Sequence, residues 1–267
     1  MSSSIFQDGI CNPMATHATP ASRRIIAQGT YETVSMLKNA EQLMLLLAFP
    51  VMALCTLRFT GILDTWASAH SISRIDATLP GVLALSVMST AFSGQGIATG
   101  FDRRYGVLRF LSTTPLGRGG LIAGKLLAVV LVLMVQVVVI CSVAFILGWQ
   151  PDVAAVLASL PTLLLGATAF TSLGLLIAGT VRAEATLAIV NMAWVILAGA
   201  GGILIPGSYL PGPLSWFTQL LPSGALGEAL RAQFIAGNFS PTSHLILLLW
   251  ALVAAALASK YFKWSAS

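Results

Sequence analysis

A basic polar stretch, residues 100–125, separates two long apolar runs, and it constrains the fold of this chain more than any other feature. Each flanking run holds about 20 mostly apolar residues, which is enough for a helix to cross a bilayer. Basic loops between two membrane spans normally stay on the cytoplasmic side. The stretch therefore predicts an inner loop and fixes the orientation of the spans beside it. Its basic residues are Arg103, Arg104, Arg109, Arg118 and Lys125.

The composition requires a lipid environment for most of the chain. Of the 267 residues, 57% are hydrophobic and only 9% are charged, whereas soluble domains carry about 25% charged residues. Because water cannot solvate so apolar a surface, we predict an all-α integral membrane protein with six transmembrane helices. The apolar runs cover residues 43–59, 79–99, 121–147, 153–181, 186–205 and 245–262.

The distribution of Lys and Arg predicts the orientation of these spans. With the N-terminus inside, all but three of the 14 Lys and Arg residues fall in inner segments. The exceptions are Arg58, Arg74 and Arg231. An excess of positive charge on the inner side is typical of cytoplasmic segments. Both termini are therefore predicted to be cytoplasmic.

Three segments lie outside the spans of a single transmembrane domain, residues 22–263. Residues 1–21 are polar and lack the apolar core of a signal peptide, so we expect a disordered cytoplasmic tail. Residues 22–40 have a rough apolar face beside charged residues, which favours an interfacial helix on the inner leaflet. A soluble helix that extends the first span fits this pattern nearly as well. Residues 206–240 are too apolar for a solvated loop and too rich in proline for one span, which predicts an external re-entrant segment.

Polar side chains inside the spans allow two interpretations. They can form hydrogen bonds between helices, each worth about 1 kcal/mol, or they can line a path for a substrate. The first is favoured because none of them is ionisable. These candidates for a substrate path are Gln95, Gln136, Thr168, Thr171 and Asn191. Small residues four positions apart, which let helices pack closely, are Gly96 with Gly100 and Ala198 with Gly202.

The sequence offers no catalytic residues and no metal site. The stretch from Gly119 to Lys125 nearly matches a phosphate-binding loop, but Leu126 stands where a Ser or Thr must hold magnesium. The few His and Cys residues lack metal-ligand spacing. The positive charge follows membrane topology, which argues against a nucleic-acid partner. The absence of Asp and Glu from the middle of the spans disfavours an ion-coupled carrier.

The basic stretch resembles the signature of ABC-2 type transporter permeases, including those that export drugs, lipids or polysaccharides. The matching residues are Gly106, Leu108, Leu111, Thr114, Pro115, Leu116, Arg118, Gly124 and Lys125. The approach to the first span, from Lys38 through Pro50, is similar to the same family. So is the external segment with Pro206 and Glu228-Ala-Leu-Arg231.

The resemblance implies an ABC-2 (type V exporter-like) permease fold in the plasma, or inner, membrane. It implies the membrane half of an ABC exporter, in which a second permease chain completes the path and separate ATPase subunits bind ATP and magnesium. Residues 100–120 would be the coupling loop that contacts the ATPase, with arginines meeting it and leucines filling its groove. The coupling residues are Arg103, Arg104, Leu108, Arg109, Leu111, Pro115 and Arg118.

The apolar spans favour an amphipathic cargo, such as a drug, a lipid or a glycolipid. Two alternatives share the same hydropathy. One is a membrane scaffold or assembly factor that transports nothing, and the other is the ion-coupled carrier already disfavoured by the missing carboxylates.

Overall fold

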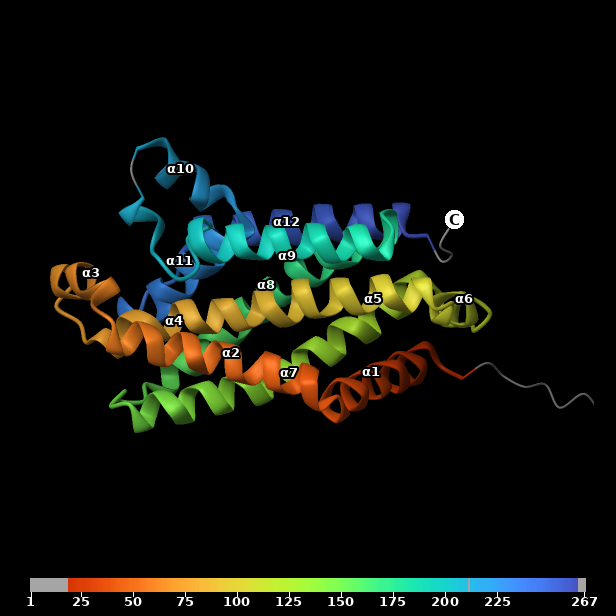
Figure 1. The fold of residues 1–267 in the computed structure, drawn as a ribbon, viewed down its shortest axis with the longest axis horizontal. Coiled ribbons are helices and arrows are strands. Elements are labelled where there is room, and N and C mark those ends of the chain that lie inside the picture. Colours follow the sequence, from red (N-terminus) through yellow and green to blue (C-terminus); the bar gives the residue numbers. More distant parts are fainter. Residues whose placement is uncertain (1–18, 211, 264–267) are drawn as a thin grey trace, which may run out of the picture.

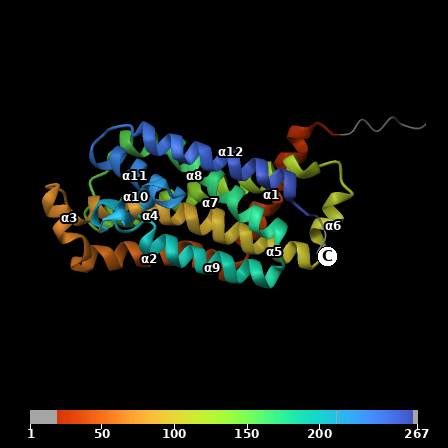
Figure 2. The ribbon, with the colours of Figure 1, turned by 90° about the horizontal axis from the view of Figure 1, so that it is seen from above.

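The computed structural model describes residues 19–210 and 212–263, which form helices and connecting turns without a β-strand. The longer helices run roughly along the long axis of the molecule (Figures 1 and 2). In chain order the elements are α1 (Ala21–Lys38), α2 (Ala40–Phe59), η1 (Gly61–Leu63), α3 (Asp64–Ala69), α4 (Arg74–Val87), the π-helix η2 (Met88–Gly94), α5 (Gln95–Arg104), α6 (Val107–Ser112), α7 (Gly117–Ile146), α8 (Val153–Thr180), α9 (Ala183–Ala200), η3 (Gly207–Tyr209), α10 (Pro213–Leu220), α11 (Pro222–Ile235) and α12 (Pro241–Tyr261). Residues 1–18 of the predicted N-terminal tail lie outside the described residues.

The prediction of an all-helical membrane protein is confirmed. Within the described residues, five helices are long and apolar enough to cross a membrane: Arg74–Arg104, which joins α4, η2 and α5, and then α7, α8, α9 and α12. A sixth span is available if the bent pair Leu46–Phe59 and Gly61–Ala69, which turns by 65°, is counted as one. The orientation of these spans relative to the cytoplasm stays a prediction.

The helix Arg74–Arg104 forms the centre of the bundle. Leu79, Val82 and Leu83 in its first half are completely buried, and they belong to the main hydrophobic core. A helix that is apolar on all sides and buried by protein on all sides is typical of a core element. The π-helical turn η2 interrupts this helix midway, and such turns are frequent at functional sites.

The fifth span ends earlier than the sequence predicts. Helix α9 stops at Ala200, and Gly202 adopts a left-handed backbone with φ of +80°. This conformation ends a helix and is available to glycine at little cost. A Cβ atom on Gly202 would lie 3.1 Å from the Cα atom of Gly224 in α11. Gly202 therefore packs against α11 rather than within the fifth span, which corrects its predicted place.

The two ends of the molecule differ in character. Helix α6 lies at one end, near the carboxyl end of the described chain, whereas α3 and α10 lie at the other end (Figures 1 and 2). The α6 end carries four exposed basic side chains, those of Arg104, Arg109, Arg118 and Lys260. The predicted external segment forms α10 and α11 at the opposite end. This arrangement is the one that the positive-inside pattern requires if α6 faces the cytoplasm.

Candidate functional site

The loop between α5 and α7 is compact and built around the short helix α6. Gly106 has a φ of +79°, which lets the chain reverse between α5 and α6. The hydroxyl groups of Ser112, Thr113 and Thr114 each donate a hydrogen bond to the carbonyl three residues earlier. These local bonds end α6 and hold the loop in a defined shape.

One face of α6 is fixed to the bundle. The Leu108 side chain is completely buried and packs with Leu121 of α7 and Phe262, which follows α12. Leu111 and Leu116 are partly buried against the same cluster. Leu108 thus lies inside this chain, and the helix is attached directly to the spans on both sides of it.

The predicted coupling arginines occupy different environments. Arg103 is buried, and its Nη1 donates a 2.8 Å hydrogen bond to the Ala178 carbonyl near the end of α8. Arg104 is exposed and forms an ion pair with Glu184 at the start of α9. Arg118 is exposed and donates to the carbonyl of Ser259 in α12 at 3.2 Å. Arg103 therefore joins α5 to α8, whereas the others lie at the surface.

The outward face of the loop combines large aromatic and basic side chains. Tyr105 is 73% exposed and Phe110 is 71% exposed, with Val107 and Arg109 beside them on the surface. Pro115 is also exposed. Large apolar side chains gathered on a loop outside the spans are typical of a protein interaction site. Tyr105 and Phe110 were not among the coupling residues predicted from the sequence, although aromatic residues next to arginines are a common interface signal.

A buried ion cluster lies beneath this loop. Lys125 in α7 has no exposed surface, and its Nζ lies 2.7 Å from Oε1 of Glu32 in α1 and 3.2 Å from Oδ2 of Asp102 in α5. Gln28 donates a further hydrogen bond to Glu32 at 3.0 Å. Three helices thus meet at one ammonium group. In the sequence Lys125 is the last basic residue of the stretch 100–125, which also holds Asp102, but the second carboxylate, Glu32, is 93 positions away.

Helix α1 packs tightly on α7 around this cluster. A Cβ atom on Gly29 would lie 2.7 Å from Cδ2 of Leu127, and one on Gly124 would lie 2.7 Å from Cγ of Gln28. Larger residues at either glycine would force the helices apart. The helix predicted to be interfacial is therefore a fixed part of the bundle at the α6 end.

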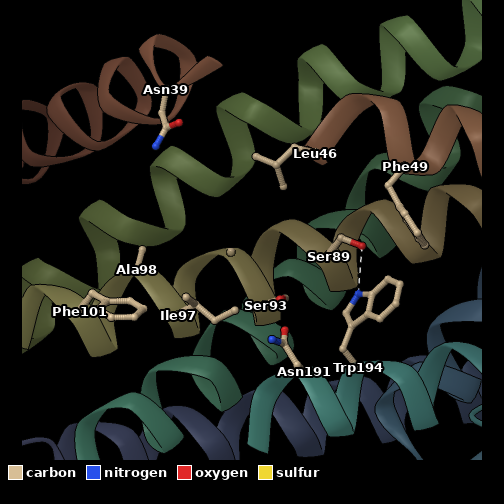
Figure 3. Close-up of a pocket in the computed structure, with 11 residues that line it drawn as sticks. Asn39, Leu46, Phe49, Ser89, Ser93, Ile97, Ala98, Phe101, Asn191 and Trp194 are labelled. Carbon is tan, nitrogen blue, oxygen red and sulfur yellow. Dashed lines mark hydrogen bonds between the residues drawn. The ribbon is translucent and has the colours of Figure 1, made fainter. Parts of the chain in front are cut away.

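A groove of about 620 Å³ lies between α2, the central helix and α9 (Figure 3). Its lining residues are Asn39, Leu46, Phe49, Ser89, Ser93, Gly94, Ile97, Ala98, Phe101, Asn191 and Trp194. None of these carries a charge. The polar groups are hydroxyls and amides, and they lie among apolar and aromatic side chains. Such a lining suits a neutral amphipathic ligand.

Among the five polar residues predicted for a substrate path, Asn191 lines this groove. Gln95 is buried, and its Nε2 lies 3.4 Å from the sulfur of Met36. Thr168 donates to the Leu164 carbonyl within α8, and Thr171 is buried in the same helix.

Gln136 has a distinct role that depends on a proline. Pro50 in α2 has no N–H group, so the carbonyl of Leu46 lacks its usual helical partner. The Nε2 of Gln136 donates to that carbonyl at 2.7 Å, and its Oε1 accepts from Thr90 at 2.8 Å. Gln136 therefore connects α7 to α2 and to the π-helix η2.

Three of the small residues predicted to let helices pack closely do lie where helices of this chain meet. A Cβ atom on Gly96 would lie 3.3 Å from the Cα atom of Gly174 in α8, and one on Gly100 would lie 3.2 Å from Thr186 in α9. Ala198 is buried in the main core.

The opposite end of the molecule holds a second buried charge. Arg231 in α11 donates to the carbonyls of Gly202, at 3.0 Å, and Ile203, and it pairs with Glu228 at 3.1 Å. Glu228 also accepts from the Gly207 amide at 3.3 Å. Burial lowers the pKa of Arg231, and the Glu228 carboxylate opposes that shift. The pair fixes the non-helical segment after α9 onto α11.

Comparison with known proteins finds one family whose model matches most of this chain. The family described as ABC-2 type transporter matches residues 25–235, from within α1 to the last residue of α11. This range holds the buried ion cluster, the α6 loop and the groove. A search of curated proteins finds no match.

Proposed function

We propose that this chain, which belongs to the ABC-2 type transporter family, forms the path of an ATP-driven exporter for amphipathic cargo. Membership makes the chain a multi-pass permease subunit of an ABC transporter, and it confirms the resemblance in the basic stretch. The direction of transport, the cargo and the separate ATPase subunits belong to the proposal. The exposed aromatic and basic face of α6 is the observation that carries it.

The face of α6 suits an ATPase partner. Tyr105 and Phe110 present large apolar surfaces that would be desolvated in a groove of the partner, as interface hot spots are. Arg109 adds positive charge, which suits an acidic rim around that groove. A cytoplasmic position of α6, which the charge distribution predicts, would place this face where a soluble ATPase can reach it.

The inward face of α6 suits transmission of the ATPase motion. Leu108 packs on α7 and on the residue after α12, while Arg103 joins α5 to α8. A rigid displacement of α6 would therefore move four spans together rather than deform a free loop. In this proposal Tyr105, Arg109 and Phe110 contact the partner, and Arg103 and Leu108 pass the motion on.

The groove is the proposed path for the cargo. A charged group seated there would lose its hydration without gaining an opposite charge, because no lining residue is ionisable. Ser93 and Asn191 can accept or donate hydrogen bonds to a neutral polar group, while Ile97 and Phe101 contact an apolar part. A second permease chain is proposed to cover the groove, because Asn191 is exposed at a depth where lipid would leave it without a hydrogen-bond partner.

ATP is proposed to bind the partner alone. The stretch from Gly119 to Lys125 is part of helix α7 rather than a phosphate-binding loop, and the Lys125 ammonium is engaged by two carboxylates. This arrangement leaves no lysine free for a phosphate there.

Transport into inside-out membrane vesicles tests the proposal. ATP, together with the ATPase that copurifies with this chain, should drive uptake of a fluorescent amphipathic dye, and dissipating the proton gradient should leave the uptake unchanged. Failure of any ATPase to copurify would favour the scaffold alternative. Uptake that stops when the proton gradient is removed, with ATP present, would favour the ion-coupled carrier.

A further inference from the structure

The groove ends in a contact between its three walls. In the predicted orientation, α2 and α9 run outward and the central helix runs inward, so the outermost lining residue on each can be identified from its number. These residues are Phe49 on α2, Ser89 on the central helix and Trp194 on α9. Figure 3 shows all three at the same end of the groove, opposite Asn39 and Phe101.

The aromatic rings of Phe49 and Trp194 meet across the groove. Their centroids lie 5.1 Å apart, and the planes are inclined by 69°, which is an edge-to-face contact. This geometry is favoured because the positive edge of one ring faces the negative surface of the other. Helices α2 and α9 are thus joined by two side chains at the outer end of the groove.

Ser89 holds the tryptophan ring in this position. The indole Nε1 of Trp194 donates a 3.1 Å hydrogen bond to the Ser89 hydroxyl, which itself donates to the Leu85 carbonyl at 2.8 Å. The bond to Leu85 orients the hydroxyl so that its lone pairs face the indole. Ser89 belongs to the π-helix η2, and such turns are frequent at functional sites.

The wall that carries Phe49 can bend next to it. Pro50 follows directly and breaks the hydrogen bonding of α2, and the carbonyl that it leaves free is satisfied by Gln136 of another helix. Proline sites of this kind are where helices kink. A small change in the bend at Pro50 would move the Phe49 ring relative to Trp194 while the Leu46 carbonyl keeps a partner.

We propose that Phe49 and Trp194 form the outer gate of the groove, and that Ser89 is the positioning residue that keeps Trp194 closed against Phe49. The gate rests on the proposed function for the role of the groove. Its closed state depends on one ring contact and one hydrogen bond, which a bend of α2 or a turn of the indole can break and restore. Opening would connect the groove with the outer side.

Cysteine labelling on intact cells tests the gate without requiring transport. Ser93, which lies deeper in the groove than Ser89, is replaced by cysteine in a full-length chain with Cys11, Cys55 and Cys141 replaced. A charged, membrane-impermeant thiol reagent is then applied from outside. With the gate residues intact, labelling of Ser93→Cys should be slow. Trp194→Ala should raise the rate roughly two- to tenfold, as expected for loss of one aromatic contact between helices.

Smaller substitutions at Ser89 test the same gate if Trp194→Ala fails to fold. Ser89→Ala should raise the labelling rate because the indole loses its acceptor, whereas Ser89→Thr should keep the slow rate because it retains a hydroxyl. Trp216→Ala, which removes an exposed tryptophan of α10, is the matched control and should change nothing.

Equal labelling rates with and without the Ser89 and Trp194 substitutions would overturn the gate, whether or not the protein transports a dye. Rapid labelling of Ser93→Cys from outside in the unchanged gate background would also overturn it. If the substitutions raise the rate but vesicles show no ATP-driven uptake, the gate stands and the proposed exporter function fails. The two proposals therefore fail separately.

Discussion

Lys125 Nζ lies 2.7 Å from Glu32 Oε1, so an ion pair with a completely buried lysine ties α1 to α7, the span that follows the α6 loop. Asp102, 3.2 Å from the same ammonium, adds the span that enters that loop. The cluster therefore joins α1 to both helices that hold α6. Any displacement of α6 relative to the membrane would be shared with α1 through this cluster.

Replacing Lys125 with Met should strongly destabilise the protein. The carboxylates of Glu32 and Asp102 would then face each other without a cation, and breaking a buried pair in this way costs about 3–5 kcal/mol. Thermal unfolding of the detergent-solubilised protein, followed by size-exclusion chromatography, measures the loss. Lys260→Met, at an exposed lysine of the same end, is the control. If the melting temperature of the Lys125→Met protein equals that of the Lys260→Met control, the cluster does not stabilise the fold.

Arg231→Met should loosen the segment between α9 and α10. The buried carbonyls of Gly202 and Ile203 would lose their donor, which costs about 1–3 kcal/mol, and the partly exposed Glu228 would lose its cation. Limited proteolysis should then cut between residues 201 and 212 faster than in the unchanged protein. Arg74→Met, which breaks an exposed pair with Asp64, should have little effect. Equal cleavage rates in both variants would show that Arg231 does not hold this segment.

Gly96→Leu should disturb the packing of the central helix on α8. The new side chain would begin 3.3 Å from the Gly174 backbone, and overpacking of this kind costs about 1–3 kcal/mol. Gly199→Leu, on α9, is a matched control because a Cβ atom there meets nothing within 4 Å. The yield of folded protein and its melting temperature should fall for Gly96→Leu alone. Similar values for the two variants would mean that the close approach at Gly96 is not required.

The predicted orientation can be tested with exposed positions at the two ends. Cysteine at Ser71 or Asn238 should react with an impermeant thiol reagent on intact cells, because both positions are exposed at the end that carries α3 and α10. Cysteine at Ser112, on α6, should react only after the cells are opened. The reverse pattern would place α6 outside and would remove the basis for docking an ATPase there.

The sequence was enough to predict most of the helical spans, because five of the six apolar runs overlap helices that are long and apolar enough to cross a bilayer. The run at residues 43–59 is shorter, and it forms a span only together with the bent continuation Gly61–Ala69. The sequence was also enough to suggest the family, through the spacing around Thr114, Pro115 and Arg118. Which side of α6 faces inward could not be predicted. The helix has only six residues, so Leu108, which is buried, and Phe110, which is exposed, looked equally apolar.

Two of the buried polar contacts were unpredictable because they join residues far apart in the chain. Glu32 and Lys125 are 93 positions apart, and Leu46 and Gln136 are 90 apart. The need for Gln136 follows from Pro50, but the sequence does not say which span supplies the missing donor. The sequence indicated that Arg103 lies on the surface of the loop, because nothing in it shows that the end of α8 packs beside this arginine.

Copurification of an ATPase with a chain substituted at Phe110 measures whether the outward face of α6 binds that partner. Phe110→Asp puts a charge into the proposed apolar contact, and loss of a central aromatic anchor costs about 2 kcal/mol or more of binding. Phe239→Asp, at an exposed phenylalanine of the opposite end, is the matched control. We expect ATPase copurification and dye-stimulated ATP hydrolysis to fall at least tenfold (roughly 1.4 kcal/mol) for Phe110→Asp and to stay unchanged for Phe239→Asp, with both proteins inserted normally. Full copurification and full stimulation with Phe110→Asp would contradict the binding of an ATPase to this face.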